Sequence, residues 1–371
     1  MRAIYAFSGD PITAGHIDIV ERAARTYSEL LVAIGENPAK TGNYLFEADQ
    51  RLAFAKSALA HLPNVSCTLF SGLLAEFAYR HGFDVIVRGV RNEGDLGDEL
   101  TLYAVNRSLH SSVDTVFLPA RPDLGHISSG VVKAIVKEGG DASAFCPLQV
   151  KQALEERLLQ RRLIGIAGGI GAGKTRIANR LVEELLPGTP AVTVNLDHVG
   201  HYVLSNSEEP IYRATRERIA KHFGAHLQAA DSAIDRRALG GIVFADGKAL
   251  RELNSIMHEP MVARLYDETL RLGAGAIIIE GAILVEAGWT RIVNNNVVLV
   301  DAPVPVRIQR IMARDGIDEV EARHRIDRQS PAAERRDLLG GQIQRDHWGQ
   351  IWEIDGENPD LEPVLASLRQ N

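Results

Sequence analysis

The chain has 371 residues, which is too many for one ordinary hydrophobic core, so we expect two domains of about 150 to 200 residues each. Hydrophobic residues make up 45% of the sequence and charged residues 24%, a globular composition that argues against disorder. The net charge of −7 gives no electrostatic reason to expect a nucleic acid or an anionic membrane as a partner. With only Cys67 and Cys146, neither a disulfide framework nor a cysteine-based metal site is expected.

The beginning of the sequence, MRAIYAFSGDP, lacks a long apolar core followed by a small-residue cleavage site, so we expect no signal peptide. No apolar run approaches the roughly 20 residues needed to span a bilayer. These features predict a cytoplasmic protein.

Short apolar runs rich in β-branched residues alternate with amphipathic segments along the first half of the chain. The runs predict strands at 2–7, 29–35, 65–70, 84–89 and 114–119. Helical spacing predicts helices at 17–27, 47–60, 73–81, 98–109 and 129–138, and then a terminal helix over 145–162. Because strand–helix alternation builds right-handed βαβ units, this half is expected to be an α/β domain around a parallel sheet.

A new strand is predicted at 163–168, directly after the terminal helix, so we place the domain boundary at Gln160. The predicted domains are therefore 1–160 and 161–371. Further strands, at 191–197, 276–284 and 295–303, repeat the α/β pattern in the second half. The halves share an architecture but no motif, so the chain is expected to be a tandem of two different α/β domains.

The first predicted strand leads into a turn with the sequence DPITAGH, from Asp10 to His16. Pro11 restricts the turn, and Gly15 allows the backbone to approach a ligand closely. His16 falls at the start of a helix, where N–H groups and the helix dipole attract phosphate. Its imidazole can donate a hydrogen bond to a phosphoryl oxygen that gains charge in a transition state. The residues alone leave open that this turn merely caps a helix.

A second strand-to-helix junction, GHISSGVVKAIV, carries Ser128, Ser129 and Lys133. Hydroxyl groups at a helix N-terminus, with a lysine one turn later, form a suitable cradle for a triphosphate. The alternative is that Ser128 caps the helix and Lys133 is solvated.

Five blocks over about residues 1–158 resemble bacterial phosphopantetheine adenylyltransferases in order and approximate spacing: DPITAGHIDIVERAA, NPAKTGNYLFEADQR, FSGLLAEFA, VIVRGVRNEGDLGDELTLYAVNR and HISSGVVK. The resemblance implies a Rossmann-like nucleotidyltransferase fold. It also implies transfer of AMP from ATP to 4′-phosphopantetheine, with in-line attack of the acceptor phosphate on the α-phosphorus and release of pyrophosphate. No covalent enzyme intermediate is implied, so catalysis would rest on positioning and charge stabilisation.

By this resemblance, four residues bind the acceptor: Ser8, Lys40, Leu73 and Arg88. Ser8 stands where the family usually has threonine, within FSGDP in place of the family's G-[TS]-F-D-P. Lys40 matches a catalytic lysine that reaches the phosphates of both substrates, in a segment with two extra residues around KTGN.

The same resemblance implies a nucleotide-binding set of Ser8, His16, Arg91, Glu99, Ser128, Ser129 and Lys133. His16 is its catalytic member, because it matches the histidine that steadies the α-phosphoryl group. A solvated turn is the alternative for Arg88 and Arg91. Two arginines around a glycine, directly after an apolar strand, make that alternative the weaker one.

The second half opens with GGIGAGKT, which fits G-x-x-x-x-G-K-[ST] between a predicted strand and a helix. The glycines let backbone N–H groups point at phosphates, the catalytic Lys174 bridges the β- and γ-phosphates, and the Thr175 hydroxyl ligates Mg²⁺. The expected nucleotide-binding residues are Gly168, Gly169, Ile170, Gly171, Ala172, Gly173, Lys174 and Thr175.

Asp197 ends the next predicted strand, AVTVNLD, which places a carboxylate at the sheet edge near the γ-phosphate. There it can orient or deprotonate an acceptor hydroxyl. The alternative is a helix N-cap for the segment beginning at His198. Residues 307–337 are rich in arginine at helical spacing, which is typical of lids over ATP in small kinases, although a solvated helical face would show the same pattern.

The second half resembles dephospho-coenzyme A kinase over about residues 162–358, through IGIAGGIGAGKT, LDHVGHYVL, HFGAHLQAADSAIDRRALGGIVFAD, LNSIMHEPM, IIIEGAILVEAGW, VVLVDAPVPVRIQRIMARDGID and, more loosely, RQSPAAERR. The resemblance implies a P-loop kinase fold with a helical lid. It implies that Asp197 is the catalytic base for a ribose 3′-hydroxyl. The lid would begin at Arg314 and close on the nucleotide through Arg335 or Arg336. The family's D-A-D, H-P and P-L-L read NLD, HEP and AIL here, and these changes touch the expected acceptor pocket.

Together the resemblances imply the last two steps of coenzyme A synthesis on one chain. The implied cofactor is Mg²⁺, the partners are ATP, 4′-phosphopantetheine, dephospho-coenzyme A and coenzyme A, and a homo-oligomer is left open. One rival is a fused nicotinamide mononucleotide adenylyltransferase and nicotinamide riboside kinase, which FSGLLAEFA and FGAHLQAADSAIDRRAL disfavour. The other is an adenylyltransferase whose P-loop domain only senses nucleotides.

Overall fold

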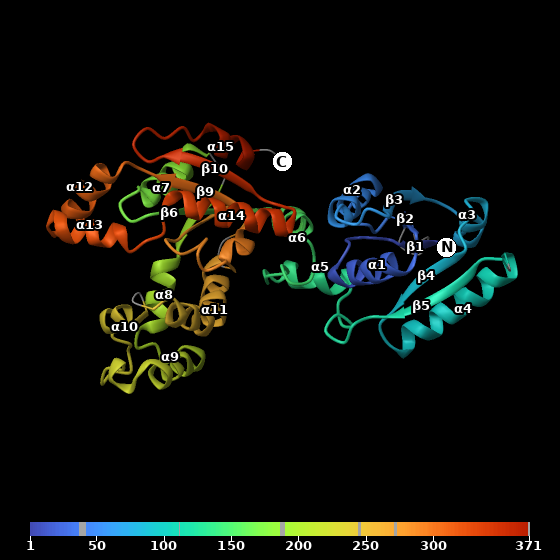
Figure 1. The fold of residues 1–371 in the computed structure, drawn as a ribbon, viewed down its shortest axis with the longest axis horizontal. Coiled ribbons are helices and arrows are strands. Elements are labelled where there is room, and N and C mark those ends of the chain that lie inside the picture. The colour runs from blue at the N-terminus through green and yellow to red at the C-terminus, as the bar shows by residue number, and fades with distance from the viewer. Residues whose placement is uncertain (37–41, 111, 186–189, 244–245, 271–272, 370–371) are drawn as a thin grey trace. The chain divides into compact units, whose positions relative to one another are not determined.

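The computed structural model describes residues 1–36, 42–110, 112–185, 190–243, 246–270 and 273–369. The chain divides into two compact units, Met1–Leu154 (unit 1) and Glu155–Asn371 (unit 2), which are described separately (Figure 1). No helix in the described part of the chain is both long and apolar enough to cross a membrane.

Unit 1 is built around a parallel sheet with the strand order β3-β2-β1-β4-β5. The order reverses between β1 and β4, which are neighbours in space although β2 and β3 separate them in sequence. Each strand lies within one residue of its predicted position, so these five predictions are confirmed. The strands are β1 (Arg2–Phe7), β2 (Glu29–Gly35), β3 (Val65–Phe70), β4 (Val85–Val90) and β5 (Asp114–Pro119).

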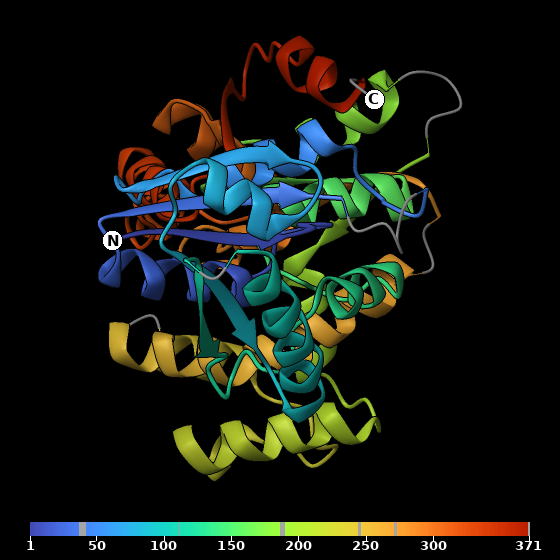
Figure 2. The same cartoon turned by 90° about the vertical axis from the view of Figure 1, so that its right-hand side faces the viewer.

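Helices lie on both faces of this sheet, and Figure 2 shows α1 below the strands and α2 above them. Successive side chains of a strand point to opposite faces of the sheet, which explains the two-sided core. Ile4 and Ile86 point into a cluster with α3. Gly89 faces α1 instead, and a Cβ added to it would lie 3.1 Å from Cγ1 of Ile19. The helices are α1 (Ala14–Thr26), α2 (Ala48–Leu59), α3 (Leu74–Arg80), α4 (Glu93–Leu109), α5 (Ser129–Lys137) and α6 (Leu148–Leu154).

Two helix predictions in unit 1 need correction. Helix α4 begins at Glu93 rather than at 98, because the Asn92 side chain accepts a hydrogen bond from the Asp95 N–H at 3.0 Å and caps the helix. The segment 145–162 is not one helix, since α6 passes into a π-helical turn, η2 (Glu155–Leu159), and β6 starts at once. Glu155 is buried and accepts from Asn294 Nδ2 at 2.7 Å, so η2 belongs to unit 2.

Unit 2 contains a second parallel sheet, with the order β10-β9-β6-β8-β7. The prediction for 191–197 is too long because helix α8 starts at Leu196. The prediction for 276–284 is too long because the chain turns at Gly281, where a Cβ would lie 2.8 Å from a methyl group of Leu196. Strand β10 was not predicted. The strands are β6 (Arg161–Gly168), β7 (Ala191–Asn195), β8 (Gly275–Glu280), β9 (Asn296–Asp301) and β10 (Gln350–Asp355).

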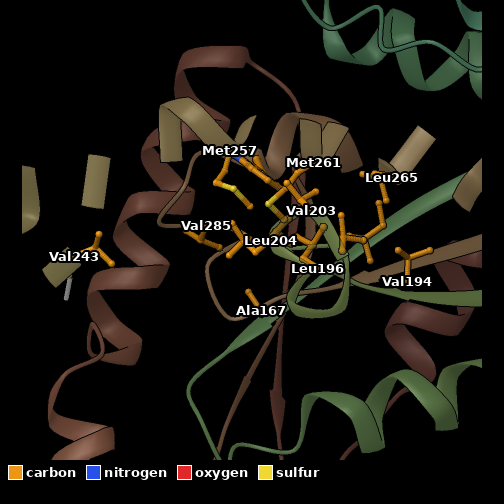
Figure 3. Close-up of a cluster of buried hydrophobic side chains, with 14 of the residues drawn as sticks. Ala167, Val194, Leu196, Val203, Leu204, Val243, Met257, Met261, Leu265 and Val285 are labelled. Atoms are coloured by element: carbon orange, nitrogen blue, oxygen red, sulfur yellow. The ribbon is translucent and has the colours of Figure 1, made fainter. Parts of the chain in front are cut away.

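Four helices, α8 to α11, gather on one side of this sheet (Figure 1). Figure 3 shows the core between them, where Leu196 and Val203 of α8 meet Met257 and Met261 of α11. The helices of unit 2 are α7 (Lys174–Glu184), α8 (Leu196–Leu204), α9 (Pro210–Phe223), α10 (Arg236–Val243), α11 (Gly247–Leu270), α12 (Val304–Asp315), α13 (Glu319–Asp327), α14 (Ala332–Asp346) and α15 (Glu362–Arg369), with short 3₁₀ turns η3 (Ala225–Leu227) and η4 (Trp289–Val293).

Candidate active sites

Unit 1 has a cavity of about 380 Å³ at the carboxyl ends of β1 and β4, where its strand order reverses. Parallel α/β sheets bind ligands at such a switch point. The wall contains seven of the predicted site residues, which lie at or after the ends of β1 and β4 and in or next to α1, α4 and α5: Ser8, His16, Arg88, Arg91, Glu99, Ser128 and Ser129.

His16 lies in the first turn of α1, and its ring orientation is fixed by the N-cap residue Thr13. The Thr13 N–H donates to His16 Nδ1 at 3.0 Å, and Thr13 Oγ1 is 2.9 Å from the same nitrogen. Because Nδ1 accepts, the neutral imidazole carries its proton on Nε2. The ring also stacks on Phe7, with centroids 4.4 Å apart. The cap that the sequence left as an alternative is therefore present, and it holds the imidazole as a hydrogen-bond donor at Nε2.

The two arginines of the cavity wall differ in exposure: the Arg88 side chain is 21% exposed, whereas that of Arg91 is 41% exposed. Arg88 forms a two-bonded ion pair with Glu99, through Nε to Oε2 at 2.5 Å and through Nη2 to Oε1, and donates to the Ala6 carbonyl at 3.1 Å. Arg91 makes a similar pair with Asp95, at 2.7 and 3.0 Å, which holds the pKa of the Asp95 carboxyl below its usual value. Glu99 therefore orients Arg88 within the wall.

The start of α5 is tied to the turn after β1. Ser129 Oγ donates to the Pro11 carbonyl at 2.7 Å, and Ser128 caps α5 by accepting from the Val131 N–H at 3.2 Å. Lys133 does not line the cavity; its Nζ lies 3.0 Å from Oδ2 of the buried Asp10. The N-terminal ends of α1 and α5 thus meet at one cavity, where both favour an anionic ligand.

One predicted acceptor-side residue of the described chain, Leu73, is not brought to this cavity. Leu73 precedes α3, is 61% exposed and does not line it. Lys40 lies outside the described residues.

Asp10 and Arg51 were not predicted as site residues. The Asp10 carboxylate accepts from the N–H groups of Leu45 and Phe46, at 3.1 and 3.0 Å. Arg51 of α2 is buried and donates to the carbonyls of Ser8 and Gly35, at the carboxyl ends of β1 and β2. A charged residue at an apolar position of α2 was the available sequence signal for Arg51.

The P-loop of unit 2 follows β6, the central strand, and leads into α7. A glycine is required at two of its positions. A Cβ on Gly168, which has φ +157°, would lie 2.2 Å from the Val300 carbonyl oxygen, and one on Gly171, which has φ +76°, would lie 2.7 Å from the Arg307 carbonyl oxygen. Gly173, with φ +108°, is the N-cap of α7. The loop before α7 therefore has the glycine-dependent backbone conformation that the motif requires for binding phosphate through N–H groups.

Lys174 folds back onto the loop and donates to the carbonyls of Gly168 and Gly169, at 3.0 and 3.2 Å. Burial lowers the pKa of its ammonium group, while the negative charges of Asp197 and Glu280 act in the opposite sense. Lys174 is thus a partly desolvated cation that gains from an anionic ligand.

Glu280, at the carboxyl end of β8, was missed by the sequence reasoning. Its Oε1 accepts from Thr175 Oγ1 at 3.2 Å and from Asn195 Nδ2, and it is 3% exposed. Its Oε2 is buried and has no hydrogen-bond partner in the part of the chain that the structure describes. An acid that directly follows the apolar run of a strand is the same signal that identified Asp197.

Asp197 lies in the first turn of α8 and is exposed, one turn from the end of β7. It is not the N-cap, because Asn195 has that role and accepts from the N–H groups of Asp197 and His198 at 2.8 and 3.2 Å. The structure therefore removes the capping alternative, and the negative charge of Asp197 acts on Lys174 and opposes the lowering of its pKa.

The three arginines of the expected lid differ in position. Arg335 of α14 is 4% exposed, pairs with Glu286 at 2.6 Å and adds a positive charge near Lys174. Arg336 is 62% exposed, pairs with Glu353 at 3.0 Å and lines a cavity of about 960 Å³ whose wall also contains Arg307 and Gln329. Arg314, at the end of α12, pairs with its neighbour Asp315. Of the two candidates for closing on the phosphates, Arg335 is the one beside the P-loop lysine.

The two folds and sites define a transferase made of a nucleotidyltransferase-like α/β unit and a P-loop kinase unit. The cytidylyltransferase-like family model matches residues 8–135, and the dephospho-CoA kinase family model matches residues 162–346.

Individual relatives match the first unit over nearly their whole length. The phosphopantetheine adenylyltransferase of Cutibacterium acnes is 42% identical over 157 residues, which is 42% of this chain and 98% of that protein. The enzyme of the same name from Methylococcus capsulatus is 43% identical over 152 residues, covering 41% of this chain and 93% of that protein. The crystal structure of TT1252 from Thermus thermophilus is 28% identical and covers 57% of this chain and 99% of that one, at a TM-score of 0.42. The chain belongs to the phosphopantetheine adenylyltransferase family through unit 1, and a dephospho-CoA kinase domain is fused to it.

Proposed function

We propose that the chain carries out the last two steps of coenzyme A synthesis. Unit 1 transfers AMP from ATP to 4′-phosphopantetheine, and unit 2 phosphorylates the ribose 3′-hydroxyl of the resulting dephospho-coenzyme A with a second ATP. The observation that carries this proposal is the pairing itself: the chain spans 98% of an adenylyltransferase relative and adds a kinase family whose substrate is that enzyme's product. We place both reactions in the cytoplasm, with the first in residues 1–160 and the second in 161–371.

In unit 1, an oxygen of the acceptor 4′-phosphate attacks the α-phosphorus of ATP. The bond from that phosphorus to the oxygen leading to the β-phosphate breaks, and pyrophosphate leaves. We assign His16 as the donor to the α-phosphoryl oxygen, because its Nδ1 is engaged by Thr13 and Nε2 carries the proton. Ser128 and Ser129, at the start of α5, hold the triphosphate, and Arg88, oriented by Glu99, holds the acceptor phosphate.

In unit 2, the ribose 3′-oxygen attacks the γ-phosphorus, the bond to the β–γ bridging oxygen breaks, and ADP leaves. We assign Asp197 as the group that orients the hydroxyl and takes its proton, since its carboxylate is exposed and acts on Lys174. Lys174 stabilises the charge on the transferred group, and Arg335 adds a second cation beside it.

Mg²⁺ fits the residues present in unit 2. The buried Glu280 oxygen without a partner in the described chain lies on the carboxylate that already binds Thr175, and a hydroxyl with a carboxylate suits a hard cation that takes its other ligands from water and phosphate. We propose that Thr175 and Glu280 hold the ion, directly or through water. When bound, it would neutralise charge on the β- and γ-phosphates.

The test is incubation of the chain with 4′-phosphopantetheine, ATP and Mg²⁺, followed by mass analysis. Coenzyme A should form in the wild type, and dephospho-coenzyme A should accumulate in Lys174→Ala, which lacks only the P-loop ammonium. Consumption of nicotinamide mononucleotide and nicotinamide riboside instead would establish the first rival. ATP binding to unit 2 without turnover of dephospho-coenzyme A would establish the sensor.

We also propose that the chain self-associates through α4. None of its residues is buried, and Leu102, Val105 and Leu109, which share one face, are 43 to 48% exposed. Val105→Glu should lower the mass measured by sedimentation equilibrium. A monomeric wild type at micromolar concentration would remove this proposal.

A further inference from the structure

One residue of the P-loop, Ile170, has both of its backbone polar groups held by side chains from outside the loop. The Ile170 N–H donates to Oε1 of Gln329 at 2.7 Å, and the Ile170 carbonyl accepts from Nε of Arg307 at 2.9 Å. P-loop N–H groups ordinarily face anionic ligands, so a carboxamide oxygen on one of them needs an explanation.

The two partners come from opposite ends of the helical arm, residues 304–327, formed by α12 and α13. Arg307 lies in the first turn of α12, and Gln329 follows the last residue of α13 by two positions. Both ends of the arm therefore contact the same P-loop residue, Ile170, although about twenty residues lie between the two contacts.

The departing end is fixed by several contacts. The Arg307 guanidinium fills the space where a side chain on Gly169 would lie, and Arg310 donates to the carbonyls of Gly171 and Ala172 at 3.2 and 3.1 Å. At the returning end, the Gln329 carboxamide makes the hydrogen bond to the loop. Loss of the hydrogen bond from Ile170 to Gln329 should therefore affect the position of the segment after α13 more than that of the start of α12.

The chain after Gln329 leads directly into helix α14. Pro331 is the N-cap of α14, and Arg335 lies in the first turns of that helix, buried and within electrostatic range of both Lys174 and Arg307. The bond from Ile170 thus fixes the start of the helix that brings a second cation to the P-loop lysine.

We propose that Gln329 is a positioning residue for phosphoryl transfer. Its hydrogen bond to the Ile170 N–H fixes the start of α14 against the P-loop and so places Arg335 beside Lys174. This inference rests on the proposed kinase function of unit 2. In this proposal Gln329 acts through the P-loop, and the loop's own N–H groups and Lys174 remain the nucleotide ligands.

Two variants separate the hydrogen bond from other effects. Gln329→Met keeps the size but removes the acceptor, so kcat for dephospho-coenzyme A phosphorylation should fall about tenfold while KM for ATP changes little. Gln329→Glu keeps an acceptor for the Ile170 N–H, so kcat should stay within about threefold of wild type, and its added charge should raise KM for ATP. Gln344→Met, at an exposed position of α14, is the matched control.

Hydrogen exchange of a peptide containing Ile170 tests the bond without reference to any substrate, and exchange should be faster in Gln329→Met than in Gln329→Glu. Wild-type kcat in Gln329→Met, an equal loss of kcat in both variants, or unchanged exchange would each overturn the inference. A wild-type chain that does not phosphorylate dephospho-coenzyme A, with the exchange difference intact, would overturn the proposed function instead.

Discussion

Replacing Glu280 by glutamine should separate catalysis from stability in unit 2. The substitution keeps the size of the side chain and an oxygen that can accept from Thr175 and Asn195. It replaces the other carboxylate oxygen, which is buried without a hydrogen-bond partner in the described residues, by an amide group. The change therefore removes a charge while leaving the existing bonds available.

The two effects differ in size. A buried carboxylate oxygen without a partner carries a desolvation cost, and the amide that replaces it is also unsatisfied, so the free energy of unfolding should change by no more than about 1 kcal/mol. That corresponds to a shift in Tm of about 2–4 °C for a unit of this size. If Glu280 helps to hold Mg²⁺, the affinity for the ion or the activity should fall by about 10–100-fold.

The assay is a Mg²⁺ titration of phosphoryl transfer, with dephospho-coenzyme A supplied directly so that unit 1 is bypassed. The midpoint of the titration should move to higher Mg²⁺ concentration in Glu280→Gln, while calorimetry shows a nearly unchanged Tm. A wild-type midpoint together with wild-type kcat would refute the assignment. Activity lost in proportion to a large drop in Tm would show that Glu280 is structural.

Four further outcomes are expected. His16→Ala should lower adenylyl transfer by about 10²–10³-fold and spare the kinase reaction, and near-normal pyrophosphate release would exclude His16 from the mechanism. Asp197→Asn should keep ATP binding, measured by calorimetry, but sharply lower phosphoryl transfer; unchanged turnover would count against a catalytic carboxylate. Arg335→Ala should lower the kinase kcat by at least about 10²-fold and Arg336→Ala by only a few-fold, because only Arg335 is buried near the P-loop lysine. A larger loss of kcat in Arg336→Ala than in Arg335→Ala would exchange their roles. Burial lowers the pKa of Lys174, so its positive charge is lost as the pH rises through that lowered value. The KM for ATP should therefore begin to rise at a pH below the ordinary lysine pKa of 10.5. A KM that stays constant up to pH 10.5 would contradict this expectation.

Local patterns were sufficient to predict the elements of unit 1 and the phosphate-binding turns. Strands β1 to β5 were located within one residue, because short apolar runs between turn residues have few other ways to bury themselves. The P-loop could be predicted from its glycines, since those at 168 and 171 lie where a side chain would collide with the backbone of Val300 or Arg307. Element ends were less predictable: α4 starts early because of a cap from Asn92, and β8 stops early because Gly281 packs against Leu196.

Which side chains meet depended on the tertiary structure. Glu280 and Thr175 are 105 positions apart in the sequence, and Gln329 and Ile170 are 159 apart, so no local spacing indicates that they bond. The order of the strands brings the ends of β6, β7 and β8 to one edge and thereby joins the P-loop to Asn195 and Glu280. Likewise, only packing distinguishes Arg335 from Arg336, since adjacent residues on a helix point about 100° apart and one of them faces the core. The sequence thus determined which chemical groups are present and which turns carry them, while the parallel pairing of strands distant in sequence decided which of these groups lie together.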